Sequence, residues 1–181
     1  MSRSIRRIGT AVAAALALGT GSAVWAASSA SAAPAVIPPV CTAGNLAVWV
    51  SADASNGAAG TLYYPLEFTN TSGHTCRTWG WPGVSATNGA GKQLGNAASR
   101  AHLYAPAWVN IPADGTAHAL LAYHDAEVET SGCKPRNASL LKVYVPNSRA
   151  ARHAFFGLPA CTTGGSHTYL TVYVIQPGAN I

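Results

Sequence analysis

The stretch of residues 66–84 constrains the fold more than any other part of the chain. It begins with alternating apolar and polar residues, which place Leu66 and Phe68 on one face of a strand and Glu67 on the other. This period of two is typical of a half-buried β-strand. Residues 70–73 (Asn-Thr-Ser-Gly) have the chemistry of a tight turn. We therefore predict a β-hairpin whose return strand carries one cysteine and two tryptophans.

The first 32 residues have the order of segments found in a secretory signal peptide. Three arginines precede an apolar run, Ala11–Leu18, and Ala30-Ser31-Ala32 supplies small residues for cleavage. The apolar run is too short to span a bilayer, and no later stretch reaches the roughly 20 apolar residues that a transmembrane helix needs. We predict a signal peptide at 1–32, an extended proline-rich leader at 33–40 and one secreted domain at 41–178, without a membrane span.

The four cysteines of the chain are predicted to form two disulfides. They are Cys41, Cys76, Cys133 and Cys161. No two are close enough for a redox or zinc motif, and an even number in an oxidising compartment favours disulfides. Four cysteines allow three pairings. We predict the sequential one, Cys41–Cys76 and Cys133–Cys161, in which each bridge stabilises the domain by roughly 3 to 4 kcal/mol.

Several further apolar runs are separated by Gly, Pro, Asn and Asp, as in an all-β domain. The expected strands are Leu46–Ser51, Val84–Thr87, Val109–Ile111, Thr116–Tyr123, Leu140–Val145 and Leu170–Ile175. Asp53–Gly60 is expected to be a loop, and a short helical turn is expected within residues 147–156. About seven short strands of this kind indicate an immunoglobulin-like antiparallel β-sandwich.

Several of these pieces, taken together, resemble a known family. The matching pieces include Phe68-Thr69-Asn70-Thr71-Ser72-Gly73 with Cys76, Gly80–Val84, Cys133-Lys134-Pro135, Leu141–Asn147 and Leu170–Gly178. In these pieces the chain resembles the actinobacterial secreted family of domains of unknown function numbered 4232. The resemblance implies a disulfide-bonded, immunoglobulin-like domain of secreted or cell-envelope proteins. It implies no activity, because that family has no catalytic or binding residues to carry over.

Trp79 and Trp81 are the candidate binding residues. Two positions apart on a strand, they would share one face. In one interpretation they pack in the core beside a disulfide, with Trp79 mostly buried and Trp81 nearer the rim because it precedes a proline. In the other they form an exposed platform for sugar rings, together with Trp108 or Tyr63.

Charge and composition argue against a cofactor, a bound metal and a nucleic-acid partner. The chain has 11 basic and six acidic residues, but three arginines lie in the predicted signal peptide and the others form no stripe. The only methionine is Met1, so the secreted domain lacks the thioether ligands that soft copper sites favour. The densest titratable group is Tyr123-His124-Asp125 with Glu127 and Glu129. We interpret it as a solvated strand end rather than as a set of metal ligands.

Three classes of function remain. The leading one is a secreted, non-catalytic extracellular or cell-envelope domain that binds a wall polymer or a secreted protein, or is structural. The second is a carbohydrate- or wall-binding module with an aromatic platform. The third is a secreted hydrolase, but the chain has no Gly-x-Ser-x-Gly motif and nothing in the sequence brings the carboxyls of Glu67 and Asp125 together. We therefore predict no enzymatic activity.

Overall fold

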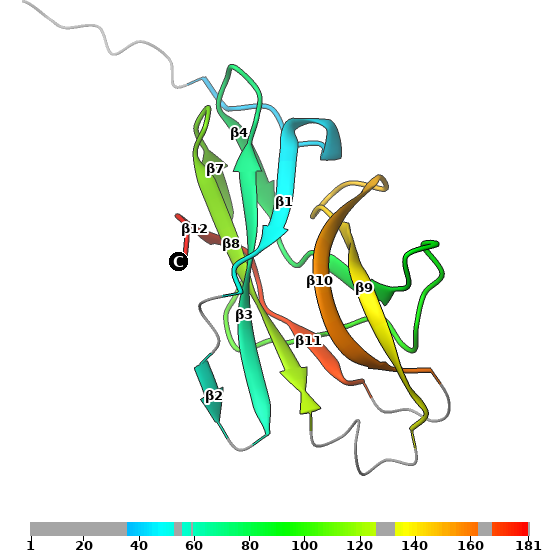
Figure 1. Ribbon diagram of the computed structural model, residues 1–181. Coiled ribbons are helices and arrows are strands. Elements are labelled where there is room, and N and C mark those ends of the chain that lie inside the picture. Colours follow the sequence, from blue (N-terminus) through cyan, green and yellow to red (C-terminus); the bar gives the residue numbers. More distant parts are fainter. Residues whose placement is uncertain (1–35, 53–55, 59, 126–132, 163–167, 181) are drawn as a thin grey trace, which may run out of the picture. The chain divides into compact units, whose positions relative to one another are not determined.

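The chain from Val36 onward forms one compact unit built of β-strands (Figure 1). The computed structural model describes residues 36–180 apart from 53–55, 59, 126–132 and 163–167. The predicted signal peptide and the first residues of the leader lie outside the described residues. The elements in chain order are the 3-10 turn η1 (Ala43–Asn45), β1 (Leu46–Val50), β2 (Asn56–Ala58), β3 (Thr61–Asn70), β4 (Cys76–Trp79), β5 (Gly83–Thr87), β6 (Ser99–Arg100), β7 (Trp108–Ile111), β8 (Thr116–His124), β9 (Pro135–Tyr144), β10 (Ala151–Cys161), β11 (Leu170–Val172) and β12 (Gln176–Pro177).

A large sheet and a three-stranded sheet form the two layers of the domain. The large sheet has the strand order β1-β3-β8-β11-β6, with β2 added to β3 and β12 added to β8. The three-stranded sheet has the order β10-β9-β5, and β4 and β7 form a separate two-stranded ribbon. The pairs are antiparallel except for β11 with β6. The prediction of an all-β, antiparallel sandwich is confirmed, whereas its immunoglobulin-like subtype remains a prediction.

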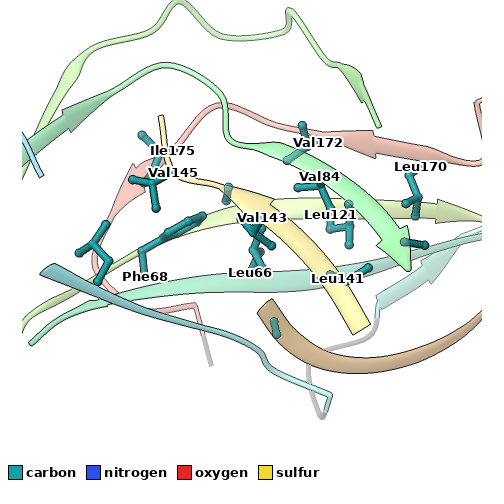
Figure 2. Close-up of a cluster of buried hydrophobic side chains, with 14 of the residues drawn as sticks. Leu66, Phe68, Val84, Leu121, Leu141, Val143, Val145, Leu170, Val172 and Ile175 are labelled. Atoms are coloured by element: carbon teal, nitrogen blue, oxygen red, sulfur yellow. The ribbon is translucent and has the colours of Figure 1, made fainter. Parts of the chain in front are cut away.

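The hydrophobic core lies between the two layers (Figure 2). Leu66 and Phe68 of β3 and Leu121 of β8 come from the large sheet, and Val84 of β5 and Val143 of β9 come from the other sheet. All five side chains are buried. Full burial of a side chain of this kind is worth about 1.5 to 3 kcal/mol, so the alternating apolar positions account for the way in which the two sheets pack together.

The predicted hairpin within residues 66–84 is wrong. Both edges of β3 are occupied, because β1 pairs along one edge and β8 along the other. The chain therefore leaves the large sheet after Asn70, and β4 pairs with β7 instead. Residues 70–73 form the turn, as predicted, but the turn joins strands of different sheets.

Asn70 holds this crossing in place. Its buried Nδ2 donates to the carbonyl oxygens of His74, Ile111 and Pro112, at 2.9, 2.9 and 3.0 Å. Its Oδ1 accepts from the backbone N–H of Ser72 at 3.0 Å and from the Ser72 hydroxyl at 2.7 Å. One side chain thus joins the end of β3, the loop before β4 and the turn after β7.

Both predicted disulfides are confirmed. The Cα atoms are 5.0 Å apart in Cys41–Cys76 and 5.4 Å apart in Cys133–Cys161. Beside the first bridge, the N–H of Cys41 donates to the carbonyl of Arg77, and the N–H of Arg77 donates to the carbonyl of Pro39, both at 2.8 Å. The end of the leader is therefore paired with β4 through its backbone.

Two segments differ from the predicted secondary structure. Residues 151–156, expected in a helical turn, belong to the long strand β10, which pairs with β9 across its whole length apart from a bulge between Phe155 and Leu158. The expected loop before β3 contains the short strand β2, which pairs with β3. In both places a partner strand supplies backbone hydrogen bonds that local residue preferences do not reveal.

Candidate functional site

Trp79 and Trp81 do not share a strand face. The strand β4 ends at Trp79, and Gly80 follows with a φ of 97°, so the chain turns between the two tryptophans. Trp81 is partly buried, and its Nε1 donates to the carbonyl oxygen of Ala101 at 2.8 Å. Its ring centroid lies 4.8 Å from that of His102. Trp81 is therefore anchored to the loop that follows β6.

Trp79 is not part of the buried core in which the first interpretation placed it, since 40% of its surface is exposed. Along β4 the inward positions belong to Cys76 and Thr78, which are both fully buried. Side chains alternate along a strand, so Arg77 and Trp79 point outward. The position of Trp79 follows from counting along the strand from the disulfide cysteine.

Trp108 completes a pair of exposed indoles, which we call the indole platform (Trp79 and Trp108). The register of β4 and β7 places these two residues directly opposite each other. Trp108 is 50% exposed. Of the two further aromatic residues considered from the sequence, the structure therefore brings Trp108 to Trp79. Tyr63 lies on β3, with its ring centroid 6.3 Å from that of Tyr173.

A groove continues from the indole platform. It has a volume of about 460 Å³ and is lined by Tyr104, Ala105, Ala107, Trp108, Val109, Asn110, Ile175, Gln176 and Pro177. Trp108 belongs both to the platform and to the groove. The groove thus combines aromatic rings with the side-chain amides of Asn110 and Gln176, which can donate and accept hydrogen bonds.

A second groove, of about 580 Å³, lies elsewhere on the domain. Its described lining residues are Asn88, Lys92, Gln93, Leu94, Arg136, Asn137 and Thr162. It is polar and cationic, and none of these residues is aromatic. The groove beside the indole platform is therefore the better candidate for a ligand that stacks on rings.

Glu67 is a buried carboxyl, although the sequence places it on the more polar face of a half-buried strand. It is 0% exposed because residues near the C-terminus cover it. Its Oε1 accepts the backbone N–H of Asn180 at 2.9 Å, whereas its Oε2 has no partner among the residues that the structure describes. The opposite residue, His118, donates from Nδ1 to the carbonyl oxygen of Gly178 at 2.8 Å. Burial raises the pKa of the Glu67 carboxyl, and the Asn180 N–H and nearby His118 offset part of this rise.

Removing this carboxyl should change how stability depends on pH. Because its pKa is raised in the folded state, Glu67 supports folding while it is protonated, and this contribution is lost as the pH rises through the raised pKa. We therefore expect the free energy of unfolding of Glu67→Gln to increase relative to that of the wild type as the pH rises above about 4, the ordinary pKa of a glutamate. Urea unfolding at several pH values measures the difference, with Asp114→Asn, in an exposed turn, as control. A difference that stays constant over these pH values would contradict the expectation.

The two carboxyls considered as a glycosidase pair lie apart. In the β3–β8 register Glu67 is opposite His118, and Asp125 follows His124, which is opposite Thr61. Asp125 is seven positions beyond His118 along the chain, which corresponds to about 23 Å at roughly 3.3 Å per residue. Inverting glycosidases use a separation of about 6.5 to 9.5 Å. Glu67 and Asp125 therefore do not form such a pair.

The group around His124 is engaged within the large sheet. Nδ1 of His124 lies 3.1 Å from the Thr61 hydroxyl, and its Nε2 lies 3.0 Å from the Thr171 hydroxyl. Asp125 accepts a hydrogen bond from the Tyr123 hydroxyl at 3.0 Å. Glu127 and Glu129 lie outside the described residues. Within the described ranges, no group of three or more His, Cys, Asp or Glu side chains is arranged to hold a metal ion.

These features define a disulfide-bonded β-sandwich domain with an exposed aromatic pair. The chain belongs to a family of domains of unknown function (DUF4232), whose model matches residues 41–176. Comparisons with curated proteins and with solved structures found no match. The described part of the chain contains no helix long and apolar enough to cross a membrane.

Proposed function

We propose that this chain is a secreted, non-catalytic domain that binds a polysaccharide of the cell envelope on the indole platform. The observation that carries the proposal is the direct pairing of Trp79 with Trp108 across β4 and β7, with both rings exposed. Sugar rings present apolar C–H faces, and large rigid aromatic side chains offer contact area to them at a low cost in conformational entropy.

The surroundings of the platform support this proposal. A monomeric domain gains no folding energy from the exposed parts of two large rings, so their exposure side by side favours a binding role. The adjoining groove supplies the amides of Asn110 and Gln176 at its wall. A few polar groups beside an apolar surface are the usual composition of a site for a small or extended ligand. Two disulfides suit the oxidising conditions outside the cell.

The test is adsorption of the domain to insoluble cell-wall polysaccharide. We expect Trp79→Ala and Trp108→Ala each to weaken adsorption by about tenfold or more, as the loss of a central aromatic contact does. Trp49→Ala is the matched control, since Trp49 is also 40% exposed but lies on β1 of the large sheet. The control should adsorb like the wild type.

Urea unfolding of the three variants separates binding from folding. Trp79 and Trp108 are partly exposed, so we expect their variants to remain folded under the conditions of the adsorption assay. Folded variants that adsorb as strongly as the wild type would contradict the proposal. Wild-type protein that captures a secreted protein but no polysaccharide would contradict it as well.

A further inference from the structure

We infer that the polysaccharide is anionic and that its carboxylate or phosphate groups bind the guanidinium of Arg77, an inference that rests on the proposed function. Arg77 and Trp79 occupy the same outward face of β4, and Arg77 is directly opposite Asn110 on β7. Arg77 is thus part of the same surface as the indole platform and its groove.

Stacking on Trp108 fixes the position of this guanidinium. The Cζ atom of Arg77 lies 4.1 Å from the centroid of the Trp108 ring. This geometry is a cation–π contact, for which tryptophan is the best partner. A guanidinium held against an indole loses less freedom when it binds a ligand than a freely rotating one, so its donors are preorganised.

The guanidinium of Arg77 has an unpaired donor within the described residues. Its Nε is buried and has no acceptor there. Arginine has five N–H donors in a planar fork that matches a carboxylate or a phosphate. The buried Nε is closed to a ligand, so an anionic group would bind the terminal Nη donors of the fork, whereas a neutral sugar would offer them only hydroxyl oxygens.

The net charge of the domain does not oppose an anionic ligand. Beyond the predicted signal peptide the sequence has eight lysines and arginines and six acidic residues, a net charge of about +2. Of the acidic residues that the structure describes, Glu67 is buried within the large sheet, and Asp125 accepts a hydrogen bond from Tyr123.

The experiment measures the affinity of the whole domain for three soluble polymers by titration calorimetry. The polymers are a neutral glucan, a polyuronate that carries carboxylates and a polyol phosphate that carries phosphodiesters. We expect the wild type to bind one of the two anionic polymers about tenfold or more tightly than the neutral one, the difference that a charge-assisted hydrogen bond makes. The preferred anionic polymer then identifies carboxylate or phosphate as the bound group.

Arg77→Gln should lower the affinity for that anionic polymer to the level of the neutral one. Arg77→Lys keeps the charge but lacks the planar fork, and should lose most of the preference. Arg100→Gln is the control, because it removes the same charge from an exposed position on β6. If Arg77→Gln is unstable, as its unfolding midpoint will show, the result for Arg77→Lys decides.

The outcomes separate this inference from the proposed function. An equal affinity of the wild type for neutral and anionic polymers, or an anionic preference that survives in both Arg77 variants, would overturn the inference alone. Affinities for all three polymers that are unchanged in Trp79→Ala would overturn the proposed function, whatever the result for Arg77.

Discussion

Gly95→Ala is expected to destabilise the domain by about 2 to 5 kcal/mol, a large fraction of the stability of a small domain. Gly95 has a φ of 70°, in the left-handed region that costs a residue with a side chain roughly 1 to 2 kcal/mol. An added Cβ would also overlap the carbonyl oxygen of Cys161 and lie 2.9 Å from Cε1 of Tyr169. The first of these contacts is with backbone, which cannot move aside as a flexible side chain can.

The surroundings of Gly95 explain why relaxation cannot relieve this overlap. Cys161 is bonded to Cys133, and the hydroxyl of Tyr169 donates to the carbonyl oxygen of Leu94 at 2.6 Å. Both neighbours of the new methyl group are therefore held by other interactions. Overpacking against fixed atoms typically costs about 1 to 3 kcal/mol and sometimes more, in addition to the backbone strain.

Gly91→Ala separates the cost of backbone strain from the cost of steric overlap. Gly91 has a similar φ of 77°, but an added Cβ there would have no atom within 4 Å. We expect it to lose only the roughly 1 to 2 kcal/mol of backbone strain. Urea unfolding of both variants measures the difference, and equal losses would show that the overlap at Gly95 is relieved by a small shift of the chain.

Local patterns were sufficient to predict most strands and the covalent frame. Alternation around Leu66 and Phe68 identified β3 and its buried face, because burial on one face imposes a period of two. The cysteine count and the predicted secretion led to two disulfides, and the sequential pairing agrees with the structure. These features depend on residues that are neighbours in the sequence or on the number of cysteines, which can be read from the sequence.

Features that depend on distant parts of the chain could not be predicted. The turn at residues 70–73 has the same residue types in a hairpin as in a crossing between sheets, so the pairing of β4 with β7 was not visible. The burial of Glu67 depends on Asn180, which is 113 residues further along the chain. A strand face that lacks an apolar pattern can therefore still be covered by a later segment.

In the candidate site too, local features could be predicted from the sequence and features that depend on distant strands could not. The outward position of Trp79 was within reach of the sequence, because Cys76 is three residues earlier and a disulfide cysteine points inward. The pairing of Trp79 with Trp108 and the stacking of Arg77 on Trp108 required the register of β4 and β7. A surface made from two strands distant in sequence becomes visible only once their pairing is known.

Asn70→Ala is expected to cost about 3 kcal/mol of unfolding free energy. The substitution removes the Nδ2 donor from the carbonyl oxygens of His74, Ile111 and Pro112, and the Oδ1 acceptor from Ser72. A buried polar group that loses its partner costs about 1 to 3 kcal/mol. Asn70 is fully buried, so water cannot replace these hydrogen bonds without opening the crossing between the sheets.

Asn88→Ala is the matched control for this prediction, and urea unfolding compares the two variants. Oδ1 of Asn88 accepts from the backbone N–H groups of Ala90 and Lys92 in an exposed turn, where water can take over. We expect it to lose only about 1 kcal/mol. Asn70→Asp should destabilise at neutral pH more than Asn70→Ala does, because it places a carboxylate oxygen against the three carbonyls that Nδ2 contacts. Equal losses in Asn70→Ala and Asn88→Ala would show that the turn alone, and not its bonds to the segment after β7, accounts for the role of Asn70.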